Sequence, residues 1–325
     1  MQETSIRPLS VLIVEALLCC SIFVGCSDLR TPFGVEHNSI ISPKGDVFAI
    51  SLKDRVVIYD VATRNKISEL NGTNGATVKF SPDSNFLVSS DLTALTLWDW
   101  RKTKKLAMWK GKNRWAFLTA FSGDSSCFAA ADDESLRVWK LRTLKMVLKV
   151  PLPYEMGSLA LSPKGNYVAV AGTETKSDPP RFHEIKVWNL STRKVAVTLR
   201  GSEYCIVKAM GFSPNGQYLA TSLSVNETKL WDLKTRKTLW KQAVKTDYGI
   251  LTFSPRGEHV IVGGHRSLYA LETISGKVTK KYELQKEEII SLTTLAKPIR
   301  LVITTNTRVL SFELQSGERQ QLFPK

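Results

Sequence analysis

Four acidic residues, one in each of four loops along the chain, are the first candidates for chemistry. They are Glu155, Glu203, Asp247 and Glu287. Carboxylates that converge at one end of a fold can hold a metal ion or transfer protons. The four histidines lack metal-ligand spacing, and the chain contains no GxSxG, HExxH or phosphate-binding loop. The sequence therefore predicts a protein without catalytic residues, metal or cofactor, and an enzyme is the alternative.

The cysteines do not indicate a disulfide scaffold or a zinc site. The chain has five of them, an odd number without a CxxC pair: Cys19, Cys20, Cys26, Cys127 and Cys205. Cys127 and Cys205 fall inside strand patterns. We therefore expect these two to be buried, unreactive thiols.

Residues 1–25 are predicted to be a signal peptide. The apolar run "VLIVEALLCCSIFV" is too short for a comfortable membrane span and contains Glu15, but it has the length of a signal-peptide core. Gly25 followed by Cys26 resembles the bacterial lipoprotein box, which implies cleavage before Cys26 and lipid attachment to it. Phe23 and Val24 depart from that box, so an uncleaved leader or a misassigned start codon stays open. Residues 26–36 would form a tether.

One turn recurs through the remainder of the chain. It reads SPKG at Ser42, and it returns at Ser81, Ser122, Ser162, Ser213, Ser254 and, in altered form, Ala296. The successive spacings are 39, 41, 40, 51, 41 and 42 residues. A period of about 40 to 45 residues with four strands in each repeat is typical of propeller blades.

Period-two patterns place four strands in each repeat. In the fifth repeat they predict strands over 205–212, 217–223, 228–233 and 238–244. We therefore predict an all-β fold, a monomeric seven-bladed β-propeller of four-stranded antiparallel blades, over residues 37–325.

The third strands carry the resemblance to a known family. Leu97, Trp98 and Asp99, with Leu230, Trp231 and Asp232, resemble the Trp-Asp ending of WD repeats. The resemblance implies a seven-bladed propeller that acts as a rigid platform for other macromolecules. The Gly-His pair usual before the first strand is missing, because Gly264 and His265 lie between the second and third strands. The family's buried hydrogen-bond tetrad is therefore not carried over to this chain.

Charge separates the two sides of the predicted blades. The formal net charge is +15, and the turns from first to second and from third to fourth strand must open on the same side. That side holds about eight acids and nineteen cations: Lys44, Arg64, Lys66, Arg101, Lys102, Lys104, Lys105, Arg142, Lys145, Lys164, Arg193, Lys194, Lys234, Arg236, Lys237, Arg256, Lys277, Lys297 and Arg319. Lysine-rich turns are also ordinary on soluble proteins. The interpretation beyond solubility is an anionic membrane surface, with Lys104, Lys105, Arg236 and Lys237 as contacts.

The opposite side carries the irregular features. The 51-residue spacing inserts residues into the fourth blade, where Pro179 and Pro180 stiffen a loop that presents Arg181, Phe182 and His183. Four loops also place an aromatic residue near the first strand of a blade: Trp115, Tyr154, Tyr204 and Tyr248. These seven residues are the predicted contacts for a partner protein, although the aromatic residues would equally pack between blades.

We interpret the chain as a non-enzymatic protein-binding scaffold, exported and anchored by lipid in a bacterium. Nucleic acid is not the expected partner, because the aromatic residues follow the strands and are not interleaved with the basic turns. The alternatives are a propeller enzyme, either a hydrolase or a quinoprotein, and a cytosolic WD-repeat scaffold.

Overall fold

The fold was analysed in a computed structural model, which describes residues 39–60, 62–63, 65–73, 77–90, 94–110, 118–132, 134–152, 155–173, 183–200, 205–244, 250–264, 266–284, 289–296, 299–305, 309–313 and 319–321. Two compact units make up the chain. The first comprises Met1–Ala116, Arg300–Val302 and Thr307–Lys325, and the second comprises Phe117–Ile299 and Ile303–Asn306. The predicted leader and tether lie outside the described residues.

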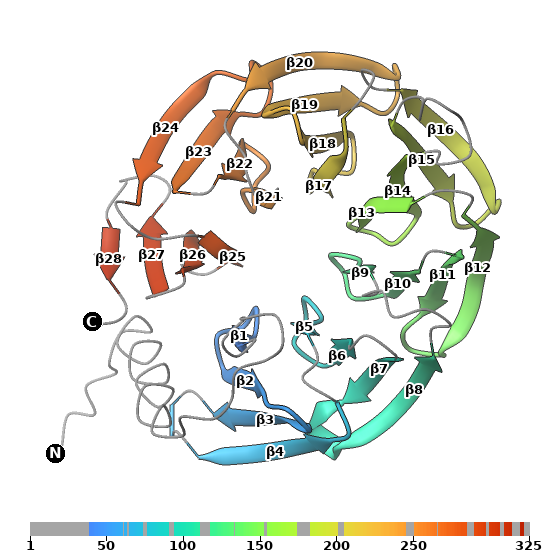
Figure 1. Ribbon diagram of the computed structural model, residues 1–325, viewed down its shortest axis with the longest axis vertical. Coiled ribbons are helices and arrows are strands. Elements are labelled where there is room, and N and C mark those ends of the chain that lie inside the picture. The colour runs from blue at the N-terminus through green and yellow to red at the C-terminus, as the bar shows by residue number, and fades with distance from the viewer. Residues whose placement is uncertain are drawn as a thin grey trace, which may run out of the picture. The chain divides into compact units, whose positions relative to one another are not determined.

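The first unit contains two four-stranded antiparallel sheets (Figure 1). Sheet A consists of β1 (Ser39–Ile41), β2 (Val47–Ser51), β3 (Arg55–Asp60) and β4 (Lys66–Asn71). Sheet B consists of β5 (Thr77–Phe80), β6 (Leu87–Ser90), β7 (Ala94–Asp99) and β8 (Lys104–Lys110), with the short 3-10 helix η1 (Trp100–Lys102) before β8.

The second unit contains four sheets of the same design. Sheet C is β9 (Leu118–Phe121), β10 (Cys127–Ala131), β11 (Ser135–Lys140) and β12 (Lys145–Pro151), and sheet D is β13 (Glu155–Leu161), β14 (Tyr167–Thr173), β15 (His183–Asn189) and β16 (Lys194–Arg200). Sheet E is β17 (Val207–Phe212), β18 (Tyr218–Leu223), β19 (Glu227–Asp232) and β20 (Lys237–Ala243). Sheet F is β21 (Ile250–Phe253), β22 (His259–Gly263), β23 (Ser267–Glu272) and β24 (Val278–Glu283).

Four further strands follow: β25 (Ile289–Ala296), β26 (Ile299–Thr305), β27 (Val309–Glu313) and β28 (Arg319–Gln321). Strand β27 pairs antiparallel with β28. The six sheets confirm the all-β fold and its four-stranded antiparallel unit. The seventh blade and the closure of a ring stay predictions.

The strands predicted for the fifth repeat are confirmed to within two residues at each end, since they correspond to β17, β18, β19 and β20. One boundary in the fourth repeat differs. His183 was expected in a loop, but it begins β15 and lies opposite Thr173 of β14. The reason is that the two strands continue to pair beyond the point where their apolar pattern ends.

The core lies between consecutive sheets, and this explains why the second strands are apolar at most positions. In β14, Val168 and Val170 pack in the cluster shared with sheet C, whereas Ala169 and Ala171 pack in the cluster shared with sheet E. Alternate side chains of a strand point to opposite faces. Both faces of sheet D are therefore buried. Cys127 and Cys205 are buried and are not part of a disulfide, as predicted.

In each of sheets A to F, the fourth strand contains a β-bulge. On β19 the register shifts between Leu230 and Trp231, which leaves Leu239 of β20 as the extra residue. The same shift occurs in the other five sheets. A bulge twists an edge strand and interrupts its hydrogen-bond ladder. It also turns the extra residue out of the regular pattern, and Leu239 is 45% exposed.

Candidate functional site

The turns between the first and second strands and between the third and fourth strands lie at the same end of each antiparallel sheet, and we call this end the turn edge. Of the nineteen cations predicted there, sixteen have described side chains, because Arg64, Lys297 and Arg319 do not. All sixteen are exposed. The turn edges of sheets A–F therefore present their positive charge to solvent, as the sequence predicted.

A buried serine organises the turn between the first and second strands. In sheet E, the Ser213 hydroxyl accepts a hydrogen bond from the Tyr218 N–H at 2.9 Å and donates one to Asn215 Oδ1 at 2.6 Å. The serines of the other five sheets accept the same bond from the residue five positions on. These bonds satisfy buried backbone donors and fix the exposed residues of the turn in place.

The fourth residue of this turn has a left-handed backbone conformation in all six sheets. Glycine occupies the position in four of them, as the sequence led us to expect, but Ser84 and Ser125 occupy it in sheets B and C with φ of 60° and 55°. The left-handed conformation of Ser84 is offset by a hydrogen bond to sheet A, because the Ser84 hydroxyl accepts from the Lys44 N–H at 3.2 Å.

An acidic or amide side chain closes the second turn of most sheets. Asp232 Oδ1 accepts hydrogen bonds from the N–H groups of Lys234 and Thr235 at 2.8 and 2.9 Å. Asp60 makes equivalent bonds in sheet A, and Asn189 makes them in sheet D. The Thr235 N–H, together with that of Lys234, holds the pKa of Asp232 below its ordinary value, against the opposing effect of burial.

We expect replacement of Asp232 by asparagine to reduce the pH dependence of stability. A carboxyl group whose pKa is depressed by folding stabilises the protein above its unfolded pKa, about 3.9, and loses that contribution as the pH falls through the folded pKa. The wild type should therefore be more stable than Asp232→Asn at pH 7, and the difference should shrink below about pH 4. Urea unfolding followed by tryptophan fluorescence between pH 2 and 7 measures it.

Glu258→Gln is the matched control, because the described residues give the Glu258 side chain no hydrogen bond. A constant difference between wild type and Asp232→Asn over the whole range would contradict the role of the carboxylate charge.

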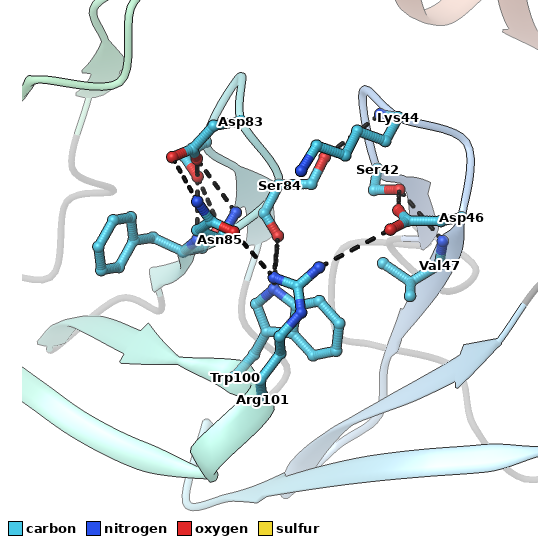
Figure 2. Close-up of polar contacts among 11 residues, drawn as sticks. Ser42, Lys44, Asp46, Val47, Asp83, Ser84, Asn85, Trp100 and Arg101 are labelled. Carbon is cyan, nitrogen blue, oxygen red and sulfur yellow. Dashed lines mark hydrogen bonds and ion pairs between the residues drawn. The ribbon is translucent and has the colours of Figure 1, made fainter.

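Figure 2 shows the turn edge shared by sheets A and B, where an arginine joins both sheets. Arg101 donates from Nη1 to the Ser84 carbonyl at 2.9 Å and to Asn85 Oδ1 at 3.1 Å, and its Nη2 lies 3.7 Å from Asp46 Oδ2 of sheet A. The guanidinium carbon also stands 4.2 Å from the ring centre of Trp100. Arg101 is thus tied to its surroundings by structural contacts, although it is half exposed.

The four cations predicted as anionic-surface contacts all lie on turn edges. Lys104 and Lys105 begin β8, and the Lys105 ammonium stands 5.1 Å from the ring centre of Trp98. Arg236 ends the last turn of sheet E, and Lys237 begins β20. Lys104 and Lys105 belong to the first unit, and Arg236 and Lys237 belong to the second.

The residues predicted on the opposite side are mostly outside the described part of the chain. These are Trp115, Tyr154, Arg181, Phe182, Tyr204 and Tyr248. Cys26 is also outside it, and of His183 only the backbone is described. Their grouping into one surface stays a prediction.

Of the four acids predicted in loops, one lies in a strand and the other three are not described. Glu155 begins β13, and Glu203, Asp247 and Glu287 lie outside the described residues. Within the described residues, no three His, Cys, Asp or Glu side chains are close enough to hold a metal ion. No helix in that part of the chain is sufficiently long and apolar to cross a membrane.

The sequence did not predict a hydrogen bond that links the second and third strands through tryptophan. The Trp231 indole N–H donates to Thr221 Oγ1 at 3.1 Å in sheet E, and the Trp98 indole N–H donates to Ser89 Oγ at 2.8 Å in sheet B. The hydroxyl residue lies ten or nine positions before the tryptophan, which is the signal that would have revealed it.

Comparisons with known proteins agree with this architecture. Residues 193–232 match the family model "WD domain, G-beta repeat", which runs from the last turn of sheet D to the end of β19. The chain is 22% identical to apoptotic protease-activating factor 1 of Rattus norvegicus over 315 residues, which cover 85% of this chain and 25% of the relative.

Two other relatives resemble shorter parts of the chain. Transcription initiation factor TFIID subunit 5 of Caenorhabditis elegans is 26% identical over 210 residues, or 62% of this chain and 31% of the relative. The lissencephaly-1 homolog of Caenorhabditis briggsae is 29% identical over 115 residues, or 34% of this chain and 27% of the relative. The chain thus spans about a quarter to a third of the length of these relatives.

Proposed function

Because residues 193–232 carry a WD40 repeat, we propose that the chain is a non-enzymatic scaffold that binds other proteins. WD40 domains commonly bind other proteins, and this chain is similar to apoptotic protease-activating factor 1 and to a lissencephaly-1 homolog. The observation that carries the proposal is the construction of the turn edge. Six sheets repeat the same buried serine turn between their first and second strands, and the turn edges of these sheets present sixteen exposed cations.

We place one partner contact on the inserted loop of sheet D. Strands β14 and β15 pair without interruption up to Thr173 and His183. Nine residues, 174–182, connect these two strands in the sequence, and Arg181 and Phe182 directly precede β15. Arginine and aromatic side chains are common anchors at protein interfaces.

The triple variant Arg181→Ala, Phe182→Ala, His183→Ala is expected to keep the melting temperature of the wild type and to lose most of the captured partner, by about tenfold or more. Surface substitutions usually change stability by about 0.5 kcal/mol or less, and His183 is only the first residue of its strand. Affinity capture from native membranes, followed by mass spectrometry, measures the loss.

Ser191→Ala with Thr192→Ala is the matched control, because both residues are exposed on the opposite edge of sheet D. Capture that is unchanged in the triple variant would move the contact elsewhere. A wild-type protein that captures no partner above the background of an unrelated bait would contradict the scaffold itself.

We also propose that the chain is exported and anchored by lipid on Cys26. The support is the apolar run at residues 11–24 and the Gly25-Cys26 pair that follows it. Mass spectrometry of the mature protein is expected to show a chain that begins with an acylated Cys26. A mature protein that still contains residues 1–25 would place it in the cytosol as a scaffold.

A further inference from the structure

We infer that the turn edge shared by sheets D and E is a docking site for a short acidic segment of a partner protein. This inference rests on the proposed scaffold function and names the chemistry of one of its partners. The site, which we call the D–E basic edge, consists of six exposed cations: Lys164, Arg193, Lys194, Lys234, Arg236 and Lys237.

The cations of the D–E basic edge are not neutralised by their surroundings. Within the described residues, none of the six forms an ion pair. The turns of sheets D and E contain one acid, Asp232, and its carboxylate is occupied by the backbone of its own turn. In the first unit, by contrast, three edge cations form ion pairs: Lys66 with Glu69 at 2.9 Å, Arg101 with Asp46 at 3.7 Å and Lys102 with Asp99 at 3.4 Å.

Neutral residues perform the tasks that acids perform in the other sheets. Asn215 accepts the hydrogen bond of the turn serine in sheet E, where Asp83 and Asp124 accept it in sheets B and C. Asn189 closes the second turn of sheet D, where Asp232 closes that of sheet E. Asn189 and Asn215 therefore keep the hydrogen bonds of their turns without adding the negative charge that aspartate would bring. Turn formation alone does not require the excess of positive charge at this edge.

Arg236 brings the charges of the two sheets together. Its backbone has φ of 62°, a conformation that is unfavourable for a residue with a side chain. Its Nη2 reaches the Ala196 carbonyl on β16 at 3.5 Å, and Ala196 is the extra residue of the bulge in sheet D. A guanidinium has five N–H donors, so this single long contact leaves most of them available to a carboxylate.

Exposed apolar side chains accompany the cations. Val195 follows Lys194 on β16 and Leu239 lies two residues after Lys237 on β20, and each is 45% exposed. A segment that combines carboxylates with an apolar side chain would match both features. The turn edges of the adjoining sheets C and F carry Asp124, Glu258 and Glu272, so a flat anionic membrane laid over the whole unit would also meet negative charge. The excess of positive charge is largest on the turn edges of sheets D and E, and this favours a short acidic segment over a membrane surface as the ligand.

The test uses the purified full chain and a fluorescein-labelled synthetic peptide of twelve residues, eight glutamates with four interspersed leucines. The double variant Asn189→Asp, Asn215→Asp preserves the hydrogen bonds of both turns and adds two negative charges at the site. We expect it to bind the peptide about 5- to 20-fold more weakly than the wild type in 50 mM salt. Its melting temperature should not change.

The matched control is Asn71→Asp with Asn226→Asp, which adds the same charge at exposed positions on the edges of sheets A and E away from the turn edge. We expect less than a twofold change in this control. A further variant, Lys194→Glu with Arg236→Glu, should abolish binding, and raising the salt to 300 mM should weaken binding in the wild type.

Equal affinity of the wild type and the Asn-to-Asp double variant would overturn the inference. So would preference for phosphatidylserine vesicles or for a single-stranded oligonucleotide over the peptide, which would assign the edge to a membrane or to nucleic acid. The scaffold proposal is judged separately, by the capture experiment on residues 181–183. A partner that is captured there while the peptide fails to bind refutes only the D–E basic edge.

Discussion

Gly157→Ala is expected to lower the free energy of unfolding by about 3 kcal/mol. Gly157 lies in β13 of sheet D, where the register shifts between Met156 and Ser158. A Cβ atom at this position would collide with the Val207 carbonyl oxygen on β17 of sheet E. Because the obstacle is backbone, no rotation of a side chain relieves it. The two first strands must move apart, and the core between sheets D and E must loosen with them.

Gly211→Ala is the matched control for this prediction. Gly211 also lies in a first strand, β17, but its Cβ would meet only the Cδ2 atom of Leu251 at 3.4 Å, the flexible end of a side chain. We expect a change of less than about 1 kcal/mol there. Urea unfolding of both variants measures the difference. Equal midpoints for Gly157→Ala and wild type would contradict the close approach of β13 and β17.

The repeating strands could be predicted from the sequence because their signal is local. The segment 217–223 alternates between side chains that pack toward one neighbouring sheet and the other, and the serine turn before it supplies a fixed starting point. This pattern located β18 to within one residue. The buried thiol of Cys127 was predictable for the same reason.

The features that shape the candidate site depend on contacts between strands and could not be predicted in this way. The reach of Arg236 to Ala196 requires the bulge in β16, which is visible only when the register with β15 is known. The sequence also did not predict that Asn189 closes the second turn of sheet D. Its equivalence to Asp232 follows from the turn hydrogen bonds, whereas the sequence shows only a near miss of the Trp-Asp ending.

Sheet F indicates why strand β25 is needed by the second unit. One face of sheet F packs against sheet E through Val260, Val262 and Leu271. The other face carries Ile261, Leu268 and Ala270, which are 0%, 0% and 3% exposed. Strand β25 contacts β21 of sheet F. Removal of β25 would therefore uncover a face that is buried in the intact chain.

A chain that ends at residue 284 is accordingly expected not to fold cooperatively. Burial of one isoleucine or leucine side chain stabilises a protein by about 1.5–3 kcal/mol, so exposing Ile261 and Leu268 together would remove a large share of the roughly 5–15 kcal/mol that stabilises a typical domain. The uncovered sheet would also present an apolar surface prone to association. Size-exclusion chromatography and thermal unfolding followed by circular dichroism provide the measurement, with a chain that lacks only residues 322–325 as the control. Recovery of the shortened chain as a soluble monomer with a sharp unfolding transition would show that sheets C to F are complete without β25, and it would remove the main support for a seventh blade.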